Sequence, residues 1–449
     1  MVNLKMAVIK NFFSFNNHFN LIFCFLPISL VLGSSILNLN IILLLIFGLK
    51  LVLVNNLKLN LSKIEYFLIL FFLFYIFTTF LNIELLGIEY FFKSIFSLRY
   101  LALYLLIKTL LENNKLELNL FFKSCLVCTS ILSIDLFVQF IYGKNLLGMV
   151  PVEGRIAGFF GSEPVAGGYI QKLFLFSFLG LFSFIEKKNY KNLFICLFLF
   201  VQTNAAIIAS NRMSFILLML TIVILIIFFS SLRKILALSL IPIFISFYFL
   251  INTYEDVSKP LKKFRADIVD IENNQELKEE VDTKNIKYKF LSSEHGRVYA
   301  SVIHSFKKKM FFGNGYKSFR ITCNPIHSKS YKFDKRMLDY DKYKPDKGDL
   351  IYRQFCSTHP HNYHLEILHD TGIIGFIIMS IFVILKLIKK ITKIIKRNNL
   401  NYIYYFTLLN FLIEIFPLKS TGSLFTTWSG TITWLVISLS LYEVKKNKY

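Results

Sequence analysis

Two histidines, His359 and His361, stand where a long polar segment gives way to an apolar run that begins at Ile373. The intervening Pro360 disfavours helix at the residue before it, so we expect a loop here that leads into a helix. A neutral imidazole can take a proton from a hydroxyl group near neutral pH, because its ordinary pKa is about 6.5. The pair indicates either a catalytic base or a polar loop with incidental histidines.

Three arginines could act with these histidines, because a guanidinium donates two parallel hydrogen bonds to a phosphate. They are Arg297, Arg212 in a tight Ser-Asn-Arg turn, and Arg155 in the glycine-rich connection 151–168. An arginine close to hydrocarbon is costly unless it has a partner or lines a wet cavity. The alternatives are a solvated charge at Arg297, a snorkelling side chain at Arg212 and a flexible surface loop around Arg155.

The elements that position these residues follow from composition. The chain has 449 residues, of which 55% are hydrophobic, and its mean hydropathy is +0.55. Soluble domains average about 45–50% apolar residues, so the sequence predicts an integral membrane protein. The net charge of +23 is divided into small clusters between apolar runs. That pattern is typical of the positive-inside rule and does not indicate a nucleic-acid partner.

Apolar stretches long enough to cross about 30 Å of hydrocarbon predict an all-α fold with about twelve transmembrane helices. The predicted spans are residues 19–37, 39–55, 64–82, 92–111, 118–142, 168–185, 192–209, 213–230, 235–252, 364–387, 401–417 and 424–442.

Lysines gather on alternate connections, which orients the spans with both termini in the cytoplasm. The basic run 386–397 is interpreted as a topology determinant that also contacts anionic lipid. The connection 253–361 is the one large loop on the opposite side. We therefore expect four parts: residues 1–150 with spans one to five, 151–252 with the Arg/Gly loop and spans six to nine, 253–363 as the large loop domain, and 364–449 with the last three spans.

Within the large loop, residues 293–310 fit an amphipathic helix along the membrane surface. Its apolar face comprises Tyr299, Val302, Ile303, Phe306 and Met310. A disulfide between Cys323 and Cys356 is chemically allowed there, outside the cytoplasm, and the sequence leaves it open. The Asp339-Tyr-Asp341 pattern could hold a divalent metal, but it lies in a lysine-rich stretch and no metal or other cofactor is expected.

Several stretches together resemble the O-antigen ligase and polymerase family of bacterial envelope glycosyltransferases. The most specific is His361-Asn362, followed after nine residues by Gly372 and then by Gly375. The resemblance extends to Arg297 with the following stretch 312–319, to Arg212, and to 154–160. It covers residues 154–375, whereas the first five spans match in hydropathy alone.

The resemblance implies a fold of the lipid-linked-sugar glycosyltransferase (GT-C-like) type in the bacterial inner membrane, with a periplasmic active site. It implies His361 and Arg297 as catalytic residues, and Arg212, Arg155, His359 and Asn362 as contacts to the diphosphate or glycan. The donor would be a glycan on undecaprenyl diphosphate, and the acceptor would be lipid A core or a growing glycan.

The resemblance leaves several activities open. Polymerase-type arginine loops place a glycine at a fixed distance, whereas Gly167 comes one residue late after Arg155 and Arg297 has no such glycine. This favours the ligase of lipopolysaccharide biosynthesis over an O-antigen or exopolysaccharide polymerase. A protein O-oligosaccharyltransferase and a lipid-linked-sugar transporter are further alternatives, although transporters typically carry ionisable residues near the membrane midplane.

Overall fold

The computed structural model describes residues 15–152, 155–185, 188–254, 257–258, 294–323, 356–396, 402–420 and 422–441. The described residues form helices and loops, with no strand among them. In chain order the helices are α2 (Phe15–Cys24), α3 (Leu26–Leu32), α4 (Ser34–Val54), α5 (Lys63–Leu81), α6 (Ile83–Leu86), α7 (Ile88–Phe96), α8 (Leu98–Glu112), α9 (Leu118–Tyr142), the short 3-10 helix η1 (Gly158–Phe160), α10 (Ala166–Phe184), α11 (Lys188–Ile208), α12 (Arg212–Phe228), α13 (Ser230–Thr253), α16 (Glu294–Lys308), α17 (Phe319–Thr322), α18 (Tyr363–Lys396), α19 (Tyr402–Glu414) and α20 (Thr427–Leu441). Asp339 and Asp341 lie outside the described residues.

Eight helical segments of the described chain are long and apolar enough to cross a membrane, which confirms a multi-pass membrane protein. They are α4, α5, α7 together with α8, α9, α10, α11, α13 and α18. The first predicted span is broken at Phe25 into α2 and α3. Three others, α12, α19 and α20, have 17, 13 and 15 residues. At about 1.5 Å per residue these helices are shorter than a hydrocarbon core of about 30 Å. The count of twelve stays a prediction.

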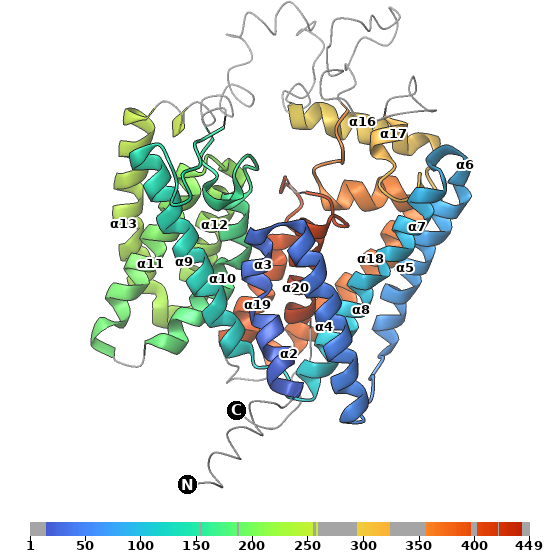
Figure 1. Cartoon of the computed structure of the whole chain (residues 1–449), viewed down its shortest axis with the longest axis horizontal. Coiled ribbons are helices and arrows are strands. Elements are labelled where there is room, and N and C mark those ends of the chain that lie inside the picture. The colour runs from blue at the N-terminus through green and yellow to red at the C-terminus, as the bar shows by residue number, and fades with distance from the viewer. Residues whose placement is uncertain are drawn as a thin grey trace, which may run out of the picture.

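Burial distinguishes the central helices from the peripheral ones. In α10, 78% of the most apolar window is buried, against 22% in α13, which lies at an edge of the bundle in Figure 1. Large apolar side chains of α13 such as Ile245 and Phe249 are exposed. A row of exposed apolar side chains on a spanning helix is the surface that lipid tails cover.

Two lysines at the start of the predicted basic run lie inside the protein. Lys386 forms a buried ion pair with Glu65 of α5. Lys390 donates to the backbone carbonyl of Ser440 and to the hydroxyl of Thr407, at 3.2 Å for the latter. The prediction that this run contacts lipid headgroups is wrong for these two residues, because a buried lysine needs such internal partners.

The predicted amphipathic helix is present as α16, which lies across the ends of the other helices (Figure 1). Its buried residues Val298 and Val302 pack with Phe319 and Cys323. The apolar face therefore packs on α17 and α18, whereas Met310 is 45% exposed. We call this end of the bundle the α16 end.

The helix α18 is kinked at Gly372, where φ is 65° and ψ is −171°. A Cβ atom at Gly372 would lie 2.2 Å from the carbonyl oxygen of Phe311, so only glycine allows this approach. The turn after α16 is held there by backbone hydrogen bonds, including Ile373 N–H to Met310 at 2.8 Å. The kink thus locks α16 onto the first turns of α18.

Candidate active site at the α16 end

His361 lies in the loop directly before α18, with a positive φ of 55° that is unusual for a residue with a Cβ atom. Its Nε2 atom is 3.0 Å from the Oγ atom of Ser357. The ring centroid lies 4.1 Å from that of His359 and 5.6 Å from that of His295, on the first turn of α16. Three imidazoles from two elements therefore meet around His361.

Asn362, which was predicted to touch substrate, begins α18 as its capping residue. Its Oδ1 atom accepts from the backbone N–H groups of His364 at 3.0 Å and Leu365 at 3.1 Å. Its Nδ2 atom donates to the carbonyl of Pro417 at 2.6 Å, and Tyr299 of α16 hydrogen-bonds to the same side chain. Burial raises the pKa of Tyr299. These contacts fix the residue that follows His361.

Arg297 belongs to the first turn of α16, two residues after His295. Its backbone belongs to the same turn as His295, while its side chain lies outside the described part of the structure. His359 has its Nδ1 atom 2.9 Å from the hydroxyl of Thr358.

Arg212 is the first residue of α12, after a tight turn in which Ser210 has a φ of 54°. Asn211 caps the helix by accepting from Ser214 N–H at 3.1 Å. A Cβ atom on Gly167 would lie 2.7 Å from that of Asn211, so the start of α10 presses against this turn. Arg212 lines a pocket whose other residues are Ala206, Ile207, Ser210, Asn211, Phe215, Phe247 and Val257.

Arg155 is exposed, and its backbone N–H donates to the carbonyl of Val152 at 2.9 Å. The connections that carry Arg155 and Arg212 and the start of α18 all lie at the α16 end (Figure 1). His361 is not among the residues that line the Arg212 pocket.

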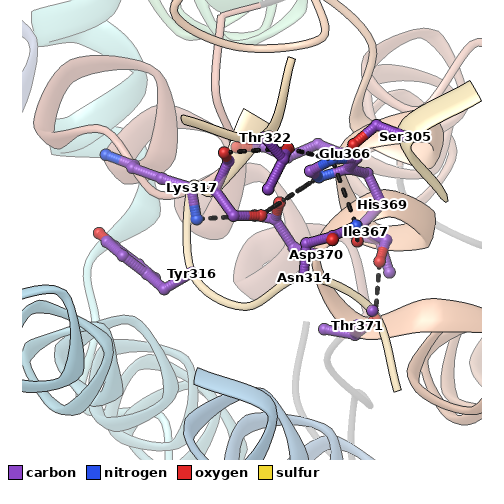
Figure 2. Close-up of polar contacts among 12 residues, drawn as sticks. Ser305, Asn314, Tyr316, Lys317, Thr322, Glu366, Ile367, His369, Asp370 and Thr371 are labelled. Atoms are coloured by element: carbon purple, nitrogen blue, oxygen red, sulfur yellow. Dashed lines mark hydrogen bonds and ion pairs between the residues drawn. The ribbon is translucent and has the colours of Figure 1, made fainter. Parts of the chain in front are cut away.

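A polar network missed by the sequence analysis lies two turns further along α18, around His369 and Asp370 (Figure 2). Asp370 Oδ1 is 2.9 Å from His369 Nδ1, and Asp370 Oδ2 accepts from the backbone N–H of Lys317 at 2.9 Å. His369 Nε2 lies 3.1 Å from Ser305 Oγ on α16 and 3.0 Å from Thr322 Oγ1 on α17. These contacts join α16, α17 and α18. Because both α18 residues are at most 1% exposed, they offer no reactive surface.

Glu366 belongs to the same face of α18. Its carboxylate accepts from the backbone N–H of Leu424 at 2.7 Å and from the hydroxyl of Ser423. Nearby Lys317 is partly exposed. Burial lowers the pKa of its ammonium group to about 8, although the charge of Glu366 acts to raise that pKa. The spacing 366, 369 and 370 places these residues on one side of a helix, and that signal in the sequence could have revealed the network.

A second buried network lies beneath the His361 loop. Lys172 of α10 pairs with Glu414 of α19, and Lys419 donates to the other carboxylate oxygen at 2.6 Å. The hydroxyl of Tyr363, two residues after His361, donates to Glu414 at 3.0 Å and lies 2.8 Å from that of Thr433. Burial lowers the pKa of Lys419 to about 8, although Glu414 opposes that shift. The network joins α10, α18, α19 and α20 directly under the candidate site.

Comparison with known proteins assigns part of the chain to a described family model. Residues 194–380 match a protein-family model described as O-antigen ligase. The matched segment runs from α11 through the kink of α18 and contains Arg212, Arg297 and His361. A search of curated proteins found no match.

Proposed function

The chain belongs to the O-antigen ligase and polymerase family through residues 194–380, and we propose that it is a ligase that transfers a glycan from undecaprenyl diphosphate to lipid A core. The transfer would occur at the periplasmic face of the bacterial inner membrane. The observation that carries this proposal is the meeting of His361 with the first turn of α16, which bears Arg297.

In this reaction His361 acts as the general base. It takes the proton from an acceptor hydroxyl, whose oxygen attacks the anomeric carbon of the donor sugar. The bond from that carbon to the diphosphate oxygen breaks, and the diphosphate leaves with the electron pair. The attack inverts the configuration at the anomeric carbon, and no metal ion is part of the proposal.

The arginines would stabilise the negative charge that builds on the leaving diphosphate. Preorganised cations in a poorly hydrated site are effective in this role, because water screens them little. We assign Arg297 and Arg212 to the diphosphate, and Arg155, His359 and Asn362 to the donor or glycan. Support comes from the position of their connections at a single end of the bundle.

The compartment is supported by the bridge between Cys323 and Cys356, at the same end. Disulfides persist in oxidising compartments such as the bacterial periplasm and are rare in the cytosol. A substrate that is exported on a lipid carrier would therefore meet His361 outside the cytoplasm.

The test is a gel and glycan immunoblot of lipopolysaccharide from a deletion strain that expresses the wild type or His361→Ala. For a ligase, the deletion lacks the ladder and accumulates lipid-linked glycan, and only the wild type restores transfer. The matched control is His304→Ala, on the exposed side of α16, which should restore the ladder. Restoration by a correctly inserted His361→Ala protein would overturn the base assignment.

The same gel separates the alternatives. A single glycan repeat on the lipid in the deletion strain would identify a polymerase. An unchanged ladder would point to another acceptor, such as a protein. Accumulation of the lipid-linked glycan on the cytoplasmic side would instead support a transporter.

A further inference from the structure

A disulfide bond joins Cys323 to Cys356, the residue directly before Ser357, whose hydroxyl contacts His361. Cys323, which follows α17, is bonded to Cys356, with 5.7 Å between their Cα atoms. Cys323 is 4% exposed and packs with Val298 and Val302 of α16. The bridge thus fastens the chain before α18 to a small apolar cluster under α16.

Ser357 is the next residue after Cys356, and its hydroxyl lies 3.0 Å from His361 Nε2. Ser357 belongs to residues 356–362, which are described as a loop that precedes α18. A hydroxyl on a loop keeps a fixed position only if its backbone is held nearby. The adjoining disulfide to a buried cysteine supplies such a restraint.

We propose that Ser357 is a positioning residue for His361, held in place by the bridge between Cys323 and Cys356. This inference rests on the proposed function, in which His361 is the base. It adds a residue that selects which ring nitrogen receives the proton.

The selection follows from imidazole chemistry. A neutral imidazole carries one N–H, and the partner of one nitrogen decides which nitrogen keeps the proton. When Ser357 Oγ accepts a hydrogen bond from Nε2–H, the lone pair of the neutral ring lies on Nδ1. The proton of the acceptor hydroxyl then passes to Nδ1, and the resulting imidazolium keeps its Nε2–H bond to Ser357.

The bridge restrains Ser357 because Cys356 and Ser357 are joined by a peptide bond. Reduction by an added dithiol gives two thiols, with two electrons and two protons supplied by the dithiol, which becomes a disulfide. The loop would then be released from the apolar cluster, and the hydroxyl of Ser357 would no longer be held against His361.

The experiment measures glycan transfer in spheroplasts of the deletion strain, with the full chain and the host's own lipid-linked glycan, between about pH 5 and pH 8. Ser357→Ala should slow transfer about tenfold or more, since general-base catalysis contributes about 10²- to 10⁴-fold. It should also move the acid side of the rate profile to lower pH, because the imidazolium loses an acceptor. Ser357→Thr keeps a hydroxyl and should retain most of the rate.

A double variant separates positioning from packing. Ser357→Ala combined with His361→Ala should be no slower than His361→Ala alone, because residues that act as one unit are not additive. The serine control is Ser246→Ala, whose hydroxyl donates to its own helix α13 at 2.9 Å.

The bridge is tested by Cys323→Ala with Cys356→Ala, against Cys196→Ala, which removes a cysteine that forms no disulfide. Immunoblots verify equal protein in the membrane, and thiol alkylation reports the bridge. The paired variant should lower the rate several-fold, and Cys196→Ala should not.

Each failure has its own signature. An inactive His361→Ala together with a wild-type rate and pH profile for Ser357→Ala overturns the positioning role and leaves the proposed function intact. Equal loss in Ser357→Ala and Ser357→Thr also overturns it, since the hydroxyl then makes no difference. A wild-type rate in the variant with both Cys323→Ala and Cys356→Ala overturns the role of the bridge in holding Ser357. An active His361→Ala overturns the proposed function itself.

Discussion

The phenolic hydroxyl of Tyr75 donates a hydrogen bond of 2.8 Å to Asp370 Oδ2, joining residues 295 apart in the sequence. This contact links the middle of α5 to the first turns of α18. Asp370 also receives the backbone N–H of Lys317 and the hydroxyl of Ser318, at 2.9 and 3.2 Å. A single buried carboxylate therefore organises the surroundings of the kink.

Removing this carboxylate should lower the free energy of unfolding more than removing one of its hydrogen-bond donors. Tyr75→Phe loses a hydrogen bond to a charged group, which we expect to cost about 1.5–3 kcal/mol. Asp370→Ala leaves several buried donors without an acceptor, at about 1–3 kcal/mol each, and should destabilise by at least about 3 kcal/mol. Unfolding of the full chain in detergent measures both. The control is Tyr66→Phe on the exposed face of α5, and equal losses for Tyr75 and Asp370 would refute this hierarchy.

Lys419 should make stability depend on alkaline pH. Burial lowers its pKa from 10.5 to about 8. Between these values the unfolded chain binds more protons at this site than the folded chain, so the free energy of unfolding gains a rising contribution with pH. Melting temperatures of wild type and Lys419→Met should diverge in favour of the wild type above about pH 8. Exposed Lys58→Met is the control, and parallel curves for Lys419→Met would contradict the expectation.

Gly372 and Gly87 provide a matched pair of glycines with positive φ, 65° and 87°, and extended ψ, −171° and 159°. A Cβ atom at Gly87 would meet nothing within 4 Å, whereas at Gly372 it would meet the backbone of Phe311. Gly87→Ala should cost about 1–3 kcal/mol of backbone strain. Gly372→Ala should cost about 1–3 kcal/mol more, because the clash forces α16 away from α18. Thermal unfolding compares them, and similar shifts would show that the close approach is dispensable.

The apolar runs predicted the helices well, because hydropathy is a local property of the sequence. The structure places a helix in every predicted span, including the short α19 and α20. The helix expected near residues 293–310 is also present. The elements that cover its apolar face, α17 and α18, were not predicted, because periodicity identifies an apolar face and does not reveal whether lipid or protein covers it.

The polar interior was harder to predict. The ion pairs of Lys172 with Glu414 and of Lys386 with Glu65 join residues 242 and 321 apart. Charge counting treats lysines as markers of the cytoplasmic surface, so it cannot identify those that pair inside the bundle. The sequence drew attention to the His361 loop because its pattern is compact, whereas the contact of Ser357 with His361 depends on the fold.

The bridge between Cys323 and Cys356 closes the 33-residue separation between them into a covalent ring. The bond keeps Cys323 and Cys356 together whatever the number of residues between them, and the entropy cost of closing a loop grows only slowly with its length. Insertions and deletions within this ring would therefore leave α17 and the start of α18 in place. The covalent bond therefore holds α17 near the start of α18 without requiring a contact from the residues between the two cysteines.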